Sequence, residues 1–243
     1  MSALLEIEGA TKVFGGVRAL DTCGLEVAEG SITGLIGPNG SGKTTLFNLV
    51  TGYLRADSGR FRFDGHDVTG ADPGRLYRRG LSRTFQQARV FPQLTVTENL
   101  VVAAGYRWWQ LATPRLAQAD RSRAAGLLEE FRLTPVAGLL ASELSYGQRK
   151  LLEFAAVLMS SPRLVLLDEP TAGVNPVTIE TMERHIRSRN AAGVTFLIVE
   201  HDMGFVMRLC DPVIVLDQGS CIFTGPPVAA QNDPRVQDAY LGA

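Results

Sequence analysis

The segment from Gly37 to Thr44 constrains the fold more than any other part of this 243-residue chain. It reads Gly-Pro-Asn-Gly-Ser-Gly-Lys-Thr and satisfies the pattern G-x-x-x-x-G-K-[ST]. A strand-like run, Ser31–Ile36, precedes it and a helical stretch, Thr44–Val50, follows, which is the context that a phosphate-binding loop requires. Glycines let backbone N–H groups turn inward toward phosphate oxygens, and the start of a helix adds the positive end of its dipole. The loop therefore predicts a nucleotide site in an α/β fold.

The residue types in this loop assign individual roles. Lys43 would reach the β- and γ-phosphates, and the Thr44 hydroxyl would ligate Mg²⁺. The alternative is a glycine-rich turn that binds nothing, and the lysine, hydroxyl and flanking elements together disfavour it. The residues expected around the phosphates are Gly37, Pro38, Asn39, Gly40, Ser41, Gly42, Lys43, Thr44 and Thr45.

Two carboxylates follow the apolar run Leu164–Leu167, which is typical of a buried strand. The strand would deliver Asp168 beside the loop, where it could hold Mg²⁺ directly or through water. Glu169 is one residue further on, and we expect the pleat of the strand to turn it toward the γ-phosphate. There it could orient and deprotonate an attacking water. The alternative is that Glu169 only caps a loop before Pro170.

Composition excludes some classes of protein. The chain has 24 Lys and Arg against 25 Asp and Glu, a formal net charge of −1, so nucleic-acid binding through bulk electrostatics is disfavoured. No apolar run reaches the roughly 20 residues that span a bilayer. The 3 cysteines fit neither a disulfide framework nor a metal cluster. We expect a chain that does not itself cross a membrane and works in a reducing compartment.

The periodicity along the chain predicts how it is organised. Near the N-terminus, Leu5 and Ile7 alternate with glutamates, as in a half-buried strand, and helical signals dominate from about residue 90 to 160. Further apolar strand runs alternate with helical stretches, which favours a parallel sheet. These runs are Thr195–Val199 and Val213–Leu216. We expect one domain over residues 1–243, with an α/β core, antiparallel β structure at its edge and a helical insertion near residues 90–160.

A third segment narrows the class. Leu144–Gln148 reads Leu-Ser-Tyr-Gly-Gln at the start of an apolar helix and resembles the signature sequence of ATP-binding cassette (ABC) proteins. The other motifs of that family follow in order along the chain. They are Phe14 for adenine stacking, Gln86 of the Q-loop, Ala172–Asn175 of the D-loop and the switch histidine, His201.

The resemblance implies a P-loop NTPase with a RecA-like core, an antiparallel β subdomain and a helical ABC subdomain. ATP and Mg²⁺ are the implied cofactors, bound between two subunits arranged head to tail. Ser145, Gly147 and Gln148 would contact the nucleotide of the opposite subunit, since a helix start with a hydroxyl and free N–H groups suits a phosphate. An isolated chain is therefore expected to bind ATP but to hydrolyse it poorly.

The resemblance also assigns the catalytic and metal-binding residues. Glu169 would be the base, Lys43 would neutralise phosphate charge, and His201 would hydrogen-bond the γ-phosphate and fix Glu169. A lone histidine is usually a structural residue, and the order of the motifs is what favours a functional role here. Gln86 would reach both Mg²⁺ and water. The implied magnesium ligands are Thr44, Gln86 and Asp168.

Two positions depart from the commonest ABC pattern: Tyr146 replaces a glycine of the signature, and Asn175 replaces an aspartate of the D-loop. Both substitutions look like the subset of importer ATPases that serve branched-chain amino acids and related solutes. The tail Asp238–Gly242 is also similar to that subset, although Ala243 stands where an acidic residue is expected.

The implied function is that of an ATP-hydrolysing importer subunit at the cytoplasmic face of the inner (plasma) membrane, held there peripherally. Its partners would be transmembrane permease subunits, an identical or related second ATPase subunit and, indirectly, a periplasmic solute-binding protein, with no nucleic acid. The alternatives are the ATPase of a lipopolysaccharide-type exporter, a non-transport ABC ATPase and a P-loop small-molecule kinase. Arg89–Pro92 could face a docking helix of the permease, and Trp108 and Trp109 either pack within the helical insertion or form a partner-facing patch.

Overall fold

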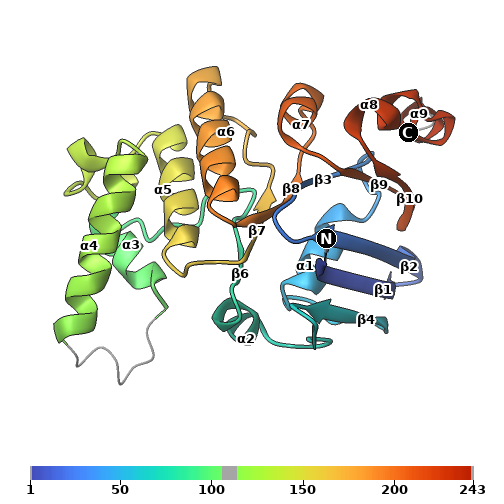
Figure 1. The fold of residues 1–243 in the computed structure, drawn as a ribbon, viewed down its shortest axis with the longest axis horizontal. Helices are drawn as coiled ribbons and strands as arrows, with labels where there is room; N and C mark the ends of the chain where they lie inside the picture. The colour runs from blue at the N-terminus through green and yellow to red at the C-terminus, as the bar shows by residue number, and fades with distance from the viewer. Residues whose placement is uncertain (1, 106–113, 242–243) are drawn as a thin grey trace.

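The structure is a computed structural model that describes residues 2–105 and 114–241 (Figure 1). Its centre is a six-stranded sheet in the order β10-β9-β3-β8-β7-β6, in which β9, β3, β8, β7 and β6 run parallel and β10 pairs antiparallel to β9. Each of β3, β7 and β8 is buried along its whole length, as expected for strands covered on both faces. The strands are β3 (Ile32–Ile36), β6 (Leu81–Arg83), β7 (Leu164–Asp168), β8 (Thr195–Val199), β9 (Val213–Asp217) and β10 (Ser220–Gly225).

A second, antiparallel sheet contains the strands predicted at the N-terminus, in the order β2-β1-β4-β5. Leu5 and Ile7 of β1 are buried while the glutamates between and after them face outward, which confirms the alternation read from the sequence. Helix α1 (Lys43–Val50) packs between the two sheets, because its Leu46 and Phe47 share one apolar core with both. The strands are β1 (Ala3–Phe14), β2 (Val17–Ala28), β4 (Ser58–Phe63) and β5 (His66–Asp67).

Helices α3 (Val96–Ala103), α4 (Pro114–Glu130) and α5 (Tyr146–Leu158) lie in the stretch predicted to be helical, with 3₁₀ turns at Thr134–Val136 and Ala141–Glu143. They form one end of the molecule, opposite α8 (Pro227–Asn232) and α9 (Pro234–Leu241) (Figure 1). A second apolar core joins these helices to the sheet. Trp108 and Trp109 lie outside the described residues.

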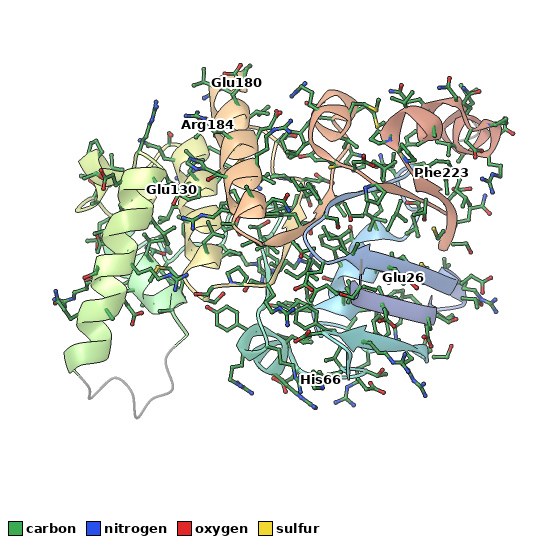
Figure 2. All side chains as sticks on the ribbon, viewed as in Figure 1. Glu26, His66, Glu130, Glu180, Arg184 and Phe223 are labelled. Atoms are coloured by element: carbon green, nitrogen blue, oxygen red, sulfur yellow. The ribbon has the colours of Figure 1, made fainter. Side chains whose placement is uncertain are left out.

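The remaining helices are α2 (Pro73–Arg78), α6 (Pro176–Ala191) and α7 (Met203–Leu209). Glu130, at the end of α4, lies on the side of its helix that faces α5 and α6 (Figure 2). It pairs there with Arg189 and lies 3.5 Å from the His185 ring nitrogen. The ring of His185 stacks on Phe131, so α6 is tied to the helical end of the molecule.

Three strands were not predicted: the two-residue β5, and β6 and β10. Strand β6 has only three residues, which is too short for any periodicity to emerge, and no residue of β10 is fully buried. Both exist because a neighbouring strand pairs with them, β7 and β9 respectively. Within the two described ranges, no helix is long and apolar enough to cross a membrane.

Candidate functional site: a nucleotide cleft

The loop between β3 and α1 has the geometry of an anion cradle. Gly37, Gly40 and Gly42 all have positive φ, at 151°, 78° and 105°. A Cβ on Gly37 would lie 2.0 Å from the Leu216 carbonyl oxygen, and a Cβ on Gly42 would lie 2.5 Å from that of Ala19. These two positions therefore require glycine for space as well as for conformation.

The amides at the start of α1 are directed to the same place. The first intrahelical bond runs from the Leu46 N–H to the Gly42 carbonyl, and no side chain caps the helix. The amides of residues 42–45 thus remain outside the helical ladder, at the positive end of its dipole. This arrangement fits the triphosphate expected at Gly37–Thr45, because phosphate oxygens would satisfy these donors.

Lys43 curls back over the loop. Its Nζ donates to the carbonyls of Gly37 and Pro38 at 2.8 Å each and to Ser41 Oγ at 3.3 Å. Burial lowers the pKa of Lys43 from its ordinary value, while the negative charge of Glu169 acts in the opposite direction. The ammonium group is therefore held inside the loop, where it can exchange carbonyl contacts for phosphate oxygens.

The three expected magnesium ligands meet in one cleft. Thr44, Gln86 and Asp168 line a cavity of about 490 Å³ together with Asn48 and Arg83. Their donor atoms are a hydroxyl, an amide oxygen and a carboxylate, which are the hard oxygen ligands that Mg²⁺ prefers. The residues present therefore fit a magnesium ion.

The sequence did not reveal the partner of Asp168. Arg83 Nη2 donates to Asp168 Oδ2 at 2.7 Å, with the two side chains 6% and 8% exposed. The same guanidinium donates to Asn48 Oδ1 at 2.6 Å and to Thr51 Oγ1 at 3.2 Å, both on the α1 segment. Arg83 therefore connects the acidic strand end to the helix that follows the phosphate loop.

Two predicted catalytic residues, Gln86 and His201, converge on the carboxylate of a third, Glu169. Gln86 Nε2 donates to Glu169 Oε2 at 2.9 Å, and His201 Nε2 lies 3.0 Å from Glu169 Oε1. Glu169 has a φ of 46°, and its N–H donates to the Val199 carbonyl at 2.9 Å. The expected cause of its direction was wrong, because β7 ends at Asp168 and a left-handed residue, not the strand pleat, aims Glu169.

Glu200 holds the backbone next to this cluster, a role that the sequence did not predict. It is 3% exposed and accepts from the Thr171 N–H at 2.7 Å and from the His201 N–H at 2.9 Å. Glu200 thereby joins the turn after Glu169 to the loop that carries His201. Its position next to His201 in the sequence was the only local signal, and charge alone did not distinguish it from a surface residue.

Phe14 lies at the end of β1, in the β1–β2 hairpin, and its side chain is 44% exposed. Lys12 Nζ lies 5.5 Å from the centre of its ring. The backbone of β2 passes against the phosphate loop, as the close approach of Ala19 to Gly42 shows. An exposed aromatic ring on this hairpin is consistent with the expected stacking on a purine base, which stays a prediction.

The signature residues do not line this cleft. Ser145 is the N-cap of α5 and forms a reciprocal capping box with Gln148, with bonds of 3.3 and 2.9 Å. Gly147 packs against α6, since a Cβ there would lie 3.0 Å from Thr178 Oγ1. Helices α5 and α1 lie on opposite sides of β6 and β7 (Figure 1). Within one chain, the structure thus brings the loop, Gln86, Asp168, Glu169 and His201 together but keeps the signature apart.

The two departures from the commonest motif pattern have structural reasons. The ring of Tyr146 packs over the D-loop, where a Cβ on Gly173 would lie 3.2 Å from Tyr146 Cε1. Asn175 is the N-cap of α6 and accepts from the Thr178 N–H at 2.9 Å. Tyr146 therefore fills space between signature and D-loop, and Asn175 supplies the cap that an aspartate would also supply.

Comparisons with known proteins agree with this geometry. A family described as "ABC transporter" matches residues 20–172, and one described as "Branched-chain amino acid ATP-binding cassette transporter" matches residues 220–243. The chain is 39% identical to the high-affinity branched-chain amino acid transport ATP-binding protein BraF of Pseudomonas aeruginosa, over 98% of both chains.

Solved structures of ATP-binding cassettes are also similar to this chain. The chain superposes with a TM-score of 0.88 on a nucleotide-free ATP-binding cassette from an ABC transporter, at 35% identity over 100% of both chains. It also superposes, with a TM-score of 0.81 and at 25% identity over 92% of this chain and 98% of the other, on a dimeric cassette bound to ADP and Pi in a post-hydrolysis state.

Proposed function

Because this chain belongs to the ABC transporter family, we propose that it is the ATP-hydrolysing subunit of an importer for branched-chain amino acids or related small solutes. The full-length similarity to BraF and the C-terminal match to branched-chain amino acid transporters support this solute class. The observation that carries the catalytic part of the proposal is the Glu169 carboxylate held between Gln86 and His201 beside the phosphate loop.

The chemistry of the site follows from these residues. Glu169 accepts the proton of a water that attacks the γ-phosphorus, while His201 and Gln86 fix the direction of its carboxylate. Lys43 and the amides at the start of α1 stabilise the negative charge on the phosphates. Mg²⁺, held by Thr44, Gln86 and Asp168, would supply further charge neutralisation when it is bound. Phe14 would hold the adenine.

The separation of the signature from the cleft supports a two-chain site. Ser145, Gly147 and Gln148 would reach the nucleotide of a second subunit, as in a head-to-tail dimer, and the dimeric relative bound to ADP and Pi is consistent with such an assembly. The proposed importer further comprises transmembrane permease subunits, to which this chain binds at the cytoplasmic face, and a periplasmic solute-binding protein. The exposed Phe91 beside the Q-loop, 56% exposed, is a permease-facing candidate.

Reconstitution tests this proposal. The chain is co-purified with the permease that binds it, placed in proteoliposomes with the solute-binding protein, and assayed for ATP-dependent uptake of radiolabelled leucine, isoleucine and valine. We expect uptake with the wild-type chain and none with Glu169→Gln, which retains ATP but lacks the base. Association with a lipopolysaccharide exporter, or ATP hydrolysis without uptake of any of these solutes, would contradict the proposed solute class.

A further inference from the structure

Two buried charged residues on α5 belong to none of the motifs described above. Lys150 is 2% exposed and Glu153 is 4% exposed. They are three residues apart, so they project from the same face of the helix that Ser145 begins. Both point at the backbone of the Q-loop, the segment from Phe85 to Arg89.

Together they bind the backbone of this segment: Glu153 accepts from its N–H groups, and Lys150 donates to its carbonyls. Glu153 Oε1 accepts from the Phe85 N–H and the Arg89 N–H, at 3.1 Å each. Lys150 Nζ donates to the Phe85 carbonyl at 3.2 Å and to the Gln86 carbonyl at 2.6 Å. The guanidinium of Arg89 lies 3.7 Å from the centre of the Phe85 ring, which further fixes the loop.

Stability alone does not account for this pair. Burial raises the pKa of Glu153 and lowers that of Lys150, so a charge on either group carries a desolvation penalty. Replacing buried charged side chains by packed apolar residues of similar volume is often neutral or stabilising. What the two charges provide instead is a fixed position for a loop backbone that has no regular secondary structure.

The contact continues into the catalytic cluster. The backbone of Gln86 is held by Lys150, and its side chain donates to Glu169. Ser145 and Lys150 lie five residues apart on one helix, about 7.5 Å along its axis at 1.5 Å per residue. One helix thus carries the signature at its start and, about 1.4 turns later, the lysine that holds the backbone of Gln86.

We propose that Lys150 and Glu153 are positioning residues that attach the Gln86 loop to the signature helix, and so maintain the Gln86–Glu169 hydrogen bond when Ser145 contacts a partner's nucleotide. This inference rests on the proposed two-chain site. It adds a mechanical link between the two nucleotide sites. The helix that contacts the nucleotide of the partner subunit also orients Gln86 in the site of its own chain.

A double-mutant cycle on the purified chain tests this link through ATP hydrolysis, at protein concentrations high enough for dimers to form. Lys150→Met should lower kcat about tenfold, the size typical of lost support for a site residue, with KM and the ATP affinity of the isolated chain little changed. Lys150→Arg, which keeps the donor, should restore most of the rate. In a Gln86→Ala background, Lys150→Met should have no further effect, because Lys150 acts through Gln86.

Arg123→Met is the matched control. Arg123 Nη2 also donates to a carbonyl of α5, that of Leu158 at 3.0 Å, but at the far end of the helix from the Q-loop. This variant should keep the wild-type kcat in both backgrounds. If Lys150→Met fails to fold, the double variant Lys150→Met/Glu153→Gln replaces it, since it leaves no unpaired buried charge.

An equal loss of kcat with and without Gln86 would overturn the proposal, because a purely structural role adds to any other defect. An unchanged kcat in folded Lys150→Met would overturn it as well. The readout is ATP hydrolysis and not solute uptake, so failure of this link and failure of the proposed import function are distinguishable.

Discussion

Glu169 shows how local backbone strain is used at the candidate site. A non-glycine residue in the left-handed region typically costs about 1–3 kcal/mol and persists only where its surroundings fix it. Here the Val199 carbonyl fixes the Glu169 amide, while Gln86 and His201 fix its carboxylate. The left-handed conformation at Glu169 thus goes with separate partners for the two neighbouring carboxylates, since Gln86 and His201 contact Glu169 and Arg83 contacts Asp168.

Arg83 leads to a prediction at the same scale. Replacing it with methionine would leave the Asp168 carboxylate buried without its cation. Removal of one partner from a buried ion pair typically destabilises a protein by about 3–5 kcal/mol. We therefore expect Arg83→Met to lower the free energy of unfolding by that order in urea titrations, and to weaken the linkage between Asn48 and the acidic strand end.

The control is Arg18→Met, at a pair that is 2.9 Å long but has side chains 58% and 42% exposed. An exposed pair of this kind contributes at most about 1 kcal/mol. Similar small losses in both variants would mean that the Arg83–Asp168 pair is not desolvated in solution.

At the scale of elements, Asn175 tests how the D-loop ends and α6 begins. Loss of an N-cap side chain typically costs about 1 kcal/mol. Asn175→Ala should therefore lower the free energy of unfolding by about that amount, whereas Asn175→Asp should keep or slightly raise it, because a carboxylate also interacts favourably with the helix dipole. Urea denaturation of the two variants measures both effects.

Thr181→Ala, one turn into α6, serves as the comparison. Its hydroxyl donates back to the Val177 carbonyl and accepts from Arg184 Nη2 at 3.3 Å, both within the helix, and surface changes of this kind usually stay within about 0.5 kcal/mol. A loss at Thr181 as large as that at Asn175 would show that α6 as a whole, and not its cap, responds.

The elements differ in how well the sequence predicted them. Strands β7, β8 and β9 were predicted to within one residue because each is a short apolar run buried on both faces. Strands β6 and β10 were missed because their strand state depends on a partner rather than on their own pattern. The start of α5 also lies within Leu144–Gln148, where the sequence predicted it, since the Ser145 cap and the apolar face carry local signals.

The candidate site divides in the same way. The loop from Gly37 to Thr44 and the Asp168–Glu169 pair could be predicted because each motif is contiguous and its chemistry is local, whereas His201 was predicted from the order of the motifs. Arg83, Glu153 and Glu200 were not, although all three side chains are buried and hydrogen-bonded at the site. Each contacts a segment that is distant in the sequence. The sequence alone does not show whether a charged residue is buried or exposed.

For the whole molecule, the proposed two-chain site implies that one chain contributes two half-sites. Helix α1, which begins at the phosphate loop, and helix α5, which Ser145 caps, lie on opposite sides of β6 and β7 (Figure 1). Ser145 is exposed, so its hydroxyl and the helix N-terminus face outward rather than into the cleft of their own chain. A second chain in the opposite orientation would complete both halves at once.

Mixing two inactive variants tests this arrangement. Ser145→Arg should block hydrolysis in its own dimer while the isolated subunit still binds ATP, and Lys43→Ala should weaken ATP binding itself. In a mixed dimer, the intact loop of the first chain meets the intact signature of the second. With half the dimers mixed and one of two sites intact in each, the rate should recover to about a quarter of wild type if the sites act independently.

The control partner is the double variant Lys43→Ala/Ser145→Arg, which offers no intact signature and should restore nothing. ATPase assays on differentially tagged mixtures read both results, and mixed dimers that stay inactive, or a Ser145→Arg subunit that no longer binds ATP, would place the signature in its own chain's site.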